Sequence, residues 1–410
     1  MKRFVLWSVL LCLTVAVGTP LMASGYSIYE HSAKASGQAG AWVARADDAA
    51  ANWYNPAALV RQGSSFQVGF NGITIGGATE LTTGGTTYEP ESSIVTPVHL
   101  YYARKVNDKL AWGIGINTPY GLATDWDLPF DYAARKSELM AVNVNVNAAF
   151  AMNEYWSFGF GLNYLYADIK DFSSNFNLQS VNPGLPDTFA VQNLHGDGTD
   201  WGFNLGLQYR SDAWAFALTW RGAMKVDVDG QLDFSEIPPG LEGFFPSMGG
   251  AATLPIPSQA AVGFAYLGWE DWELEFDVSW AGWDEFDSLV IDFDNGSTRI
   301  IPEDWTDTRA YRLGVSRLVR DKHDFRLGVV YDENPVPDHT ARPSIPDADR
   351  YGVSVGYGWS GRSFDLDFYY MALFFNDRTI PPYPWDPSVI PGKYESFTNL
   401  FGLTFSWRFD

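Results

Sequence analysis

The chain has 410 residues, of which 16% are aromatic and 19% charged, and its formal net charge is −22. Apolar side chains are therefore abundant but are diluted by polar ones along the whole chain, which is typical of sheets with two different faces. The strong negative charge argues against nucleic acid or an anionic membrane surface as a partner.

The N-terminus has the three parts of a secretory signal. Lys2 and Arg3 precede an apolar stretch over residues 4–17, which leads to the small residue Ala23. We predict a signal peptide over residues 1–23, because a stretch of this length is short for a transmembrane anchor. Removing the two bases changes the net charge from −22 to −24, and the only cysteine of the chain leaves with the signal. The exported chain must therefore be held together without disulfides.

The next segment, residues 24–64, lacks the alternation of a strand and is rich in Gly, Ala and small polar residues. About forty such residues cannot bury a core of their own. We expect this segment to lie as a hatch, or plug, inside a barrel formed by residues 65–410.

From residue 65 onward, apolar and polar side chains alternate, as in strands whose two faces meet different surroundings. The clearest case is residues 140–150, in which Asn143, Asn145 and Asn147 share one face and apolar side chains form the other. Asparagine disfavours strands, so this face predicts a wet barrel interior.

The alternating segments predict an all-β fold, a transmembrane antiparallel barrel of about fourteen strands. Aromatic residues close the ends of several apolar faces, where a ring can lie between lipid and headgroup. Tight links alternate with long loops rich in Pro and Gly, as expected for periplasmic turns and extracellular loops. The predicted strands lie near residues 65–75, 95–105, 110–118, 137–152, 156–172, 199–210, 214–228, 258–267, 272–283, 307–318, 325–331, 349–359, 364–376 and 399–409.

The long loops carry apolar residues at Phe130, Phe244, Phe245, Met248 and Trp385. Exposed apolar clusters usually mark an interaction site. We predict an outer apolar groove that collects hydrophobic solute; the alternative is that these loops fold over and bury one another.

The sequence offers no catalytic constellation. Its five histidines are scattered, none with the spacing of a metal site, and no nucleophile elbow, Walker loop or dinucleotide fingerprint is present. We therefore expect no enzyme activity, no metal and no cofactor.

Six short motifs lie in the first half of the chain: Ser24–Ala33, Gly37–Gly40, Ala46–Ala49, Asn55–Ala58, Trp112–Thr124 and Asn153–Tyr164. In their order and spacing they resemble the long-chain fatty acid transporter family of outer-membrane proteins (FadL/TodX, OMPP1). The resemblance implies a hatch-plugged barrel of fourteen strands that takes up hydrophobic small molecules by diffusion.

The resemblance also assigns roles within the hatch. Asn55, Pro56 and Ala57 match the hatch motif of the family, where asparagine can hydrogen-bond its own turn and proline fixes the backbone beside it. Tyr26 falls where the family places an N-terminal aromatic residue in the inner pocket, so its displacement by ligand would start the gating movement.

The family further implies a lateral exit through the barrel wall, at an inward kink of the third strand. Gly113 and Gly115 are the candidates for this kink, because glycine interrupts strand packing and lets the backbone bend. The alternative for either glycine is that it admits a bulky neighbour in the lumen.

The cargo stays open between long-chain fatty acids and aromatic hydrocarbons, because residues 166–171 mix acid with base where a carboxylate partner is expected. We expect a monomer in the outer membrane, in contact with lipid and lipopolysaccharide and inserted by the barrel assembly machinery. The alternatives are a barrel enzyme of the lipase or protease type and a general porin.

Overall fold

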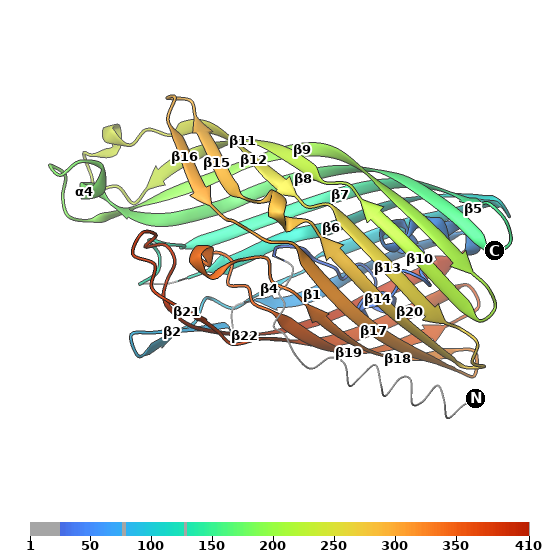
Figure 1. The fold of residues 1–410 in the computed structure, drawn as a ribbon. Helices are drawn as coiled ribbons and strands as arrows, with labels where there is room; N and C mark the ends of the chain where they lie inside the picture. The colour runs from blue at the N-terminus through green and yellow to red at the C-terminus, as the bar shows by residue number, and fades with distance from the viewer. Residues whose placement is uncertain (1–24, 76–78, 127–128, 410) are drawn as a thin grey trace.

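The computed structural model describes residues 25–75, 79–126 and 129–409, and these form one closed antiparallel barrel around an N-terminal plug (Figure 1). The predicted signal peptide lies outside the described residues. No helix in the described part of the chain combines the length and apolar character needed to cross a membrane.

Fourteen strands of the described residues make the wall, and pairing of β1 with β22 closes it. Each overlaps one of the fourteen predicted strands, so the predicted fold class is confirmed. The wall strands are β1 (Ser65–Ile75), β5 (Val98–Asn107), β6 (Leu110–Asp125), β7 (Lys136–Ala151), β8 (Trp156–Asn177), β9 (Phe189–Arg210), β10 (Trp214–Arg221), β13 (Gln259–Tyr266), β14 (Trp272–Ala281), β17 (Thr308–Val319), β18 (His323–Asp332), β19 (Arg350–Ser360), β20 (Phe364–Phe375) and β22 (Gly392–Arg408).

Additional strands extend the wall beyond the ends of the predicted ones, on the side of the long loops (Figure 1). The strand predicted over 214–228 is in fact two strands, because the ladder breaks at Gly222 and Ala223. The additional strands are β2 (Thr79–Thr83), β3 (Thr86–Tyr88), β4 (Ser93–Val95), β11 (Met224–Ser235), β12 (Met248–Ile256), β15 (Ser288–Phe293), β16 (Thr298–Pro302) and β21 (Arg378–Ile380).

Alternation along β7 assigns its two faces as predicted. Val146 and Phe150 are exposed on the outside of the barrel, whereas Asn143, Asn145 and Asn147 point inward and are buried. The interior they face is not wet, however. The hatch occupies the lumen there: Asn147 donates to Asn52 of the hatch, whereas Asn143 and Asn145 donate to asparagines of the wall.

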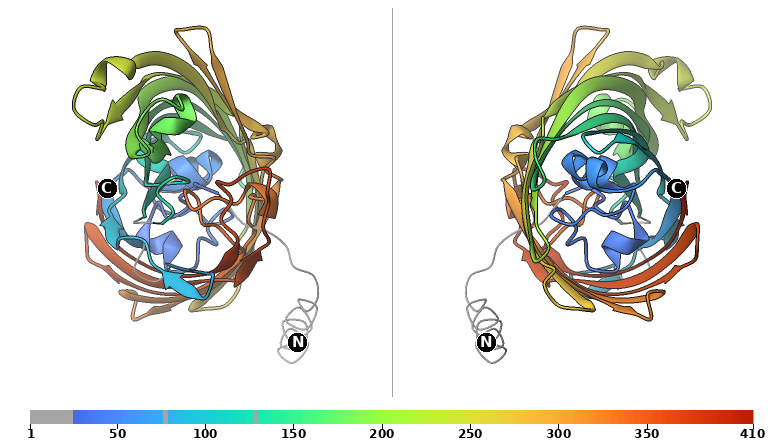
Figure 2. Two further views of the ribbon diagram at one scale, coloured as in Figure 1. Left: turned by 90° about the vertical axis from the view of Figure 1, so that its left-hand side faces the viewer. Right: turned by 90° about the vertical axis from the view of Figure 1, so that its right-hand side faces the viewer.

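The hatch occupies the barrel near the ends of the short turns, and both end-on views in Figure 2 show it surrounded by the wall. Its small residues let its backbone touch the wall: a Cβ added to Gly328 of β18 would lie 2.2 Å from the carbonyl carbon of Gln38. Gly and Ala are therefore dictated here by close packing of two backbones. The hatch elements are α2 (Ala33–Ser36), α3 (Ala51–Tyr54) and the 3₁₀ helix η1 (Pro56–Arg61).

The outer loops carry the remaining short helices. Apolar side chains within residues 176–190 and 234–245 form a small cluster of their own at the outer tip. The main apolar core lies below it, between the first residues of the hatch, around Tyr26, and the outer loops. The loop helices are α4 (Leu178–Val181), η2 (Glu242–Phe244), η3 (Trp283–Glu285) and η4 (Asp338–Thr340).

Candidate binding pocket and hatch

A pocket of about 600 Å³ lies under the outer loops, on the outer side of the hatch. The extended parts of β7, β8 and β9 form one wall of it, and β11, β12, β15 and β16 form another. Most of its lining is apolar, so it is built to take hydrophobic surface out of water. Apolar lining residues include Leu122, Leu139, Ile169, Leu194, Val228, Leu254, Leu289, Ile291, Ile301 and Ile345.

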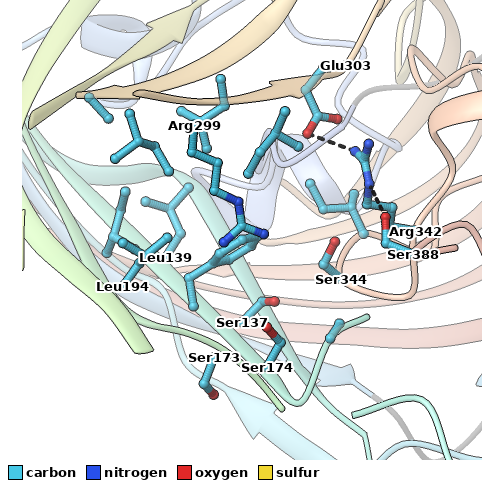
Figure 3. Close-up of a pocket in the computed structure, with 18 of the residues that line it drawn as sticks. Ser137, Leu139, Ser173, Ser174, Leu194, Arg299, Glu303, Arg342, Ser344 and Ser388 are labelled. Carbon is cyan, nitrogen blue, oxygen red and sulfur yellow. Dashed lines mark hydrogen bonds and ion pairs between the residues drawn. The ribbon is translucent and has the colours of Figure 1, made fainter. Parts of the chain in front are cut away.

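One cation reaches into this pocket. Figure 3 shows the side chain of Arg299, from β16, extending across it, with Leu139 and Leu194 on one side. Among the described residues none accepts a hydrogen bond from its guanidinium, whose planar donors match a carboxylate. The hydroxyl-bearing residues Ser137 and Ser174 line the same part of the pocket.

A second arginine, Arg342, lines the pocket on the side of the outer loops. Its guanidinium is already occupied by hydrogen bonds to other residues of the chain. It donates to Glu303 at 3.1 Å and to Ser388 at 2.9 Å (Figure 3). It also donates to Asp386 at 2.9 Å. Burial raises the pKa of Glu303 to about 7, although Arg342 beside it acts in the opposite direction. Arg342 therefore ties three loops together and is not free to bind a ligand.

Tyr26 forms the floor of the pocket. The side chain is 4% exposed, and its hydroxyl donates to the carbonyl of Pro255 at 2.7 Å. Its ring meets Trp283 edge to face, with centroids 4.8 Å apart, and Trp305 at 5.7 Å. An aromatic residue thus separates the pocket from the hatch below it.

Residues 25–28, which we name the latch segment, pair with β6 where its ladder is irregular. Ile28 N–H donates to the carbonyl of Pro119 at 2.8 Å, and Gly121 N–H donates to the carbonyl of Tyr26 at 3.0 Å. At its start, Gly25 N–H donates to Asp347 at 3.0 Å. Burial raises the pKa of Asp347 to about 6, against the opposing effect of Arg350.

The irregularity of β6 is a bulge. Asn117 pairs with Asn143 and Tyr120 with Ala141, so two residues of β6 face Val142 alone. Pro119 has no N–H to give to the ladder, which explains why the pairing fails there. Pro119, directly after the strand predicted over 110–118, was the local signal that could have located this bulge.

At Gly113 and Gly115, where the kink is predicted, the register is continuous, so the bulge lies further along β6 than these glycines. A Cβ on Gly113 would lie 2.3 Å from Oδ1 of Asn52, and one on Gly115 would lie 2.8 Å from the ring of Tyr101. These glycines make room for bulky neighbours in the lumen, which was the alternative.

Asn55 lies between α3 and η1, and Pro56 and Ala57 are the first residues of η1. The Asn55 carboxamide accepts the Ala57 N–H at 3.1 Å and donates to the carbonyl of Val43 at 3.0 Å. A Cβ on Gly206 of β9 would lie 2.4 Å from Oδ1 of Asn55. The motif therefore fixes a turn that is pressed directly against the wall.

Residues 42–45, which we name the anchor segment, are held by the acidic face of β14. Arg45 donates to Glu275 at 2.7 Å and to Glu273 at 2.7 Å. Asp277 accepts the N–H groups of Trp42 and Val43 at 2.7 and 2.9 Å. Alternation places these three carboxylates on one face of β14, but it could not identify their partner, which lies about 230 residues away.

The residues predicted to form one outer groove lie in different clusters. Phe130 is buried in the main core, next to Trp126, whereas Phe245 is buried in the tip cluster. Phe244 is 64% exposed at the tip. Met248 opens β12. Trp385 is 74% exposed and lines the mouth of the pocket. A single groove is therefore replaced by a pocket mouth and a separate tip, since each loop packs on its nearest hairpin.

The opposite side of the hatch faces a second large cavity of about 460 Å³, near the short turns. Its lining is dominated by charged side chains, so it is a polar vestibule. The charged residues that line this vestibule are Lys34, Arg45, Asp47, Asp48, Glu270, Asp271, Glu273, Asp324, Arg326, Asp365, Asp367 and Arg408. Within the described ranges, no group of three or more His, Cys, Asp or Glu side chains is placed to hold a metal ion.

The model of one protein family, described as outer membrane protein transport protein (OMPP1/FadL/TodX), matches residues 14–409. The long-chain fatty acid transport protein of Escherichia coli O6:H1 is 28% identical over 398 residues, covering 87% of this chain and 88% of the relative. Outer membrane protein P1 of Haemophilus influenzae is 24% identical, over 84% of this chain and 80% of the relative.

Two solved structures share the fold. A Pseudomonas aeruginosa FadL homologue superposes with a TM-score of 0.83 at 20% identity, over 94% of this chain and 100% of the homologue. The Pseudomonas putida toluene transporter TodX superposes with a TM-score of 0.71 at 15% identity, over 95% of this chain and 99% of the transporter.

Proposed function

The chain belongs to the outer membrane transport protein family OMPP1/FadL/TodX, and from this premise we propose that it is an outer-membrane channel for diffusion-driven uptake of hydrophobic small molecules bearing a carboxylate. The observation that carries the proposal is the apolar pocket above a plugged lumen, with Arg299 as its free cation.

The pocket suits an alkyl chain. Burying apolar surface is worth roughly 25 cal/mol per Å², so a solute that leaves water for this pocket gains free energy in proportion to its length. A volume of about 600 Å³ lies in the range of pockets that enclose ligands of drug size.

Arg299 favours a fatty acid over a neutral hydrocarbon as cargo. A guanidinium with unused donors in an apolar pocket is stabilised by a carboxylate, which accepts two parallel hydrogen bonds. An aromatic hydrocarbon would leave this cation without a partner. The similarity to a long-chain fatty acid transport protein supports the same choice.

We further propose that the cargo leaves sideways, at the β6 bulge. The latch segment connects the pocket floor to this bulge through Tyr26 and Ile28, so displacing Tyr26 pulls on the wall where its ladder is weakest. The path straight down is unfavourable, because it passes the hatch and then the charged vestibule.

Two other functions are disfavoured. A general porin needs an open lumen, whereas the hatch occupies this one. A barrel enzyme of the lipase or protease type has no use for a hatch. From the outer-membrane location we also propose that the chain contacts lipopolysaccharide, that the barrel assembly machinery inserts it and that it is a monomer.

The cargo is tested by binding of a long-chain fatty acid and of the alcohol of equal length to the purified full chain. Arg299→Gln should weaken fatty acid binding about tenfold or more, the loss of one charge-assisted pair, and leave alcohol binding unchanged. Arg104→Gln, an exposed arginine of β5, is the matched control. Equal affinities in both variants would refute the role of the carboxylate.

The exit is tested by deleting Pro119, which leaves Thr118 alone opposite Val142 and restores a regular ladder. The variant should assemble and bind fatty acid but deliver little to the cell, whereas Thr118→Ser should behave as the parent. Normal uptake by the assembled deletion variant would place the exit elsewhere.

A further inference from the structure

A third cavity, of about 80 Å³, lies between the hatch and the wall strands β9, β10, β13, β14 and β17. It sits below the pocket floor: Gln259 lines it and donates to the hydroxyl of Tyr120, whose ring contacts Tyr26. Its volume accommodates two or three water molecules or one compact ion.

Arg221 of β10 lines this cavity and is 7% exposed. Its guanidinium stacks 3.8 Å above the ring of Trp53 and donates to the Trp53 carbonyl at 3.2 Å and to Asn163. Both hydrogen-bond acceptors are neutral. No carboxylate of the described residues lies within 4 Å of its guanidinium nitrogens, so the charge of Arg221 is not neutralised by an ion pair.

Two buried arginines at the opposite side of the hatch differ in this respect. Arg45 pairs with Glu275 and Glu273, and Arg326 pairs with Asp324 and Asp367. Burying an unpaired cation costs several kcal/mol in a low-dielectric interior, which explains why these two are paired. Arg221 therefore calls for a negative partner that the chain itself does not supply.

The lining of the cavity offers further donors to such a partner. Thr219 and Gln259 flank Arg221 on the wall side. The Ser27 hydroxyl, on the hatch side, is buried and has no hydrogen-bond partner among the described residues. Arg312, 5% exposed, lines the cavity as well and donates to Ser279 at 2.6 Å, adding positive potential.

One carboxylate also lines the cavity, but it is already used. Asp332 accepts from Arg350 at 2.9 Å at the outer rim of the barrel. The Glu30 carboxylate, on the hatch beside Arg312 and Arg350, accepts the N–H of Tyr29 at 3.2 Å. Neither is paired with Arg221.

We propose that this cavity is a binding site for a compact monovalent anion, held by Arg221 with Thr219, Gln259 and Ser27 as additional donors. The anion has the size of a halide ion or of a single carboxylate group. It links the wall to the hatch directly beneath Tyr26, because Arg221 already contacts Trp53 and Ser27 belongs to the latch segment.

Two sources supply this chemistry: a free halide, or the carboxylate of a cargo molecule that has displaced Tyr26. Only the second source rests on the function proposed above. The two are separated by using an inorganic probe in one experiment and an alkyl carboxylate in the other.

The test uses crystals of the full chain in detergent, grown with bromide as the only halide and measured at the bromine absorption edge. We expect an anomalous peak at hydrogen-bond distance from the Arg221 guanidinium, which identifies a free halide site. Halide-free crystals grown with decanoate form the second arm, and carboxylate density at Arg221 identifies the cargo as the source. Water alone in both arms overturns the site.

Substitutions of Arg221 test whether this residue binds the anion. Arg221→Gln should lose the bromide or carboxylate density, whereas Arg317→Gln, which removes an exposed charge elsewhere on the wall, should keep it. Arg221→Lys retains the charge and covers the case in which the glutamine variant does not assemble. Density that persists in an assembled Arg221→Gln barrel would also overturn the assignment.

Discussion

The two ends of the hatch are held by different kinds of contact. The anchor segment is fixed by the buried Arg45–Glu275 ion pair and by the buried carboxyl group of Asp277. The latch segment is held by aromatic contacts of Tyr26 and a few backbone hydrogen bonds. Buried ion pairs are lost only at a high cost, whereas aromatic contacts can be exchanged for those of a ligand. The contrast predicts a hatch that stays in place while its latch moves.

The largest effect is expected from Glu275→Gln, which leaves Arg45 buried without its fully buried carboxylate partner. Breaking a buried pair by removing one partner costs about 3–5 kcal/mol. Denaturant unfolding in detergent should show this loss, and planar bilayers should show raised conductance as the hatch loosens. Glu273→Gln, whose carboxylate is 37% exposed, should cost under about 1 kcal/mol. Equal losses would mean that burial of the Arg45–Glu275 pair does not strengthen the anchor segment.

A smaller effect is expected from Gly206→Ala, which presses a methyl group onto Asn55 and Pro56. Overpacking of this kind costs about 1–3 kcal/mol. The measurement is again the unfolding free energy, together with fatty acid uptake by assembled barrels. Gly243→Ala, at a loop position where the added Cβ meets nothing within 4 Å, is the control and should change neither.

Tyr26→Phe should act on the latch alone. It removes the hydrogen bond to Pro255, worth about 1 kcal/mol, and keeps the ring. Because ligand must displace this residue, fatty acid affinity should rise about fivefold while the unfolding midpoint barely changes. A lower affinity would show that Tyr26 contacts bound ligand instead of competing with it.

The smallest effect is expected from pH. The pKa of Asp347 is raised to about 6 in the folded protein, so its contribution to stability is present below its unfolded pKa, near 4, and is lost as pH rises through about 6. Exchange of the latch-segment amides should therefore quicken a few-fold between pH 5 and 7, beyond the intrinsic dependence. Asp347→Asn should abolish this additional pH dependence of the exchange rate. If the additional dependence is unchanged in the variant, it arises from Glu303 instead.

The sequence by itself determined the wall and the plug. Alternation is a local property, since each strand residue points to the face opposite its neighbour, so the inward direction of Asn145 and the outward direction of Val146 follow from order alone. The small residues of the hatch likewise predicted a segment that has no core of its own and must pack against the barrel wall. The ends of β8 and β9 were missed, because above the membrane the strands no longer need an apolar face.

Only the tertiary structure decided the site. Whether Arg299 is free and Arg45 paired depends on which strands the closed barrel brings together, and the Arg45 partners lie about 230 residues along the chain. The bulge at Pro119 faces the latch segment only because the hatch folds back inside the barrel. The order of residues encodes the period of each strand and the face to which each side chain points. Strand register and barrel closure instead fix the distances between side chains that are remote in the sequence, and those distances make the pocket.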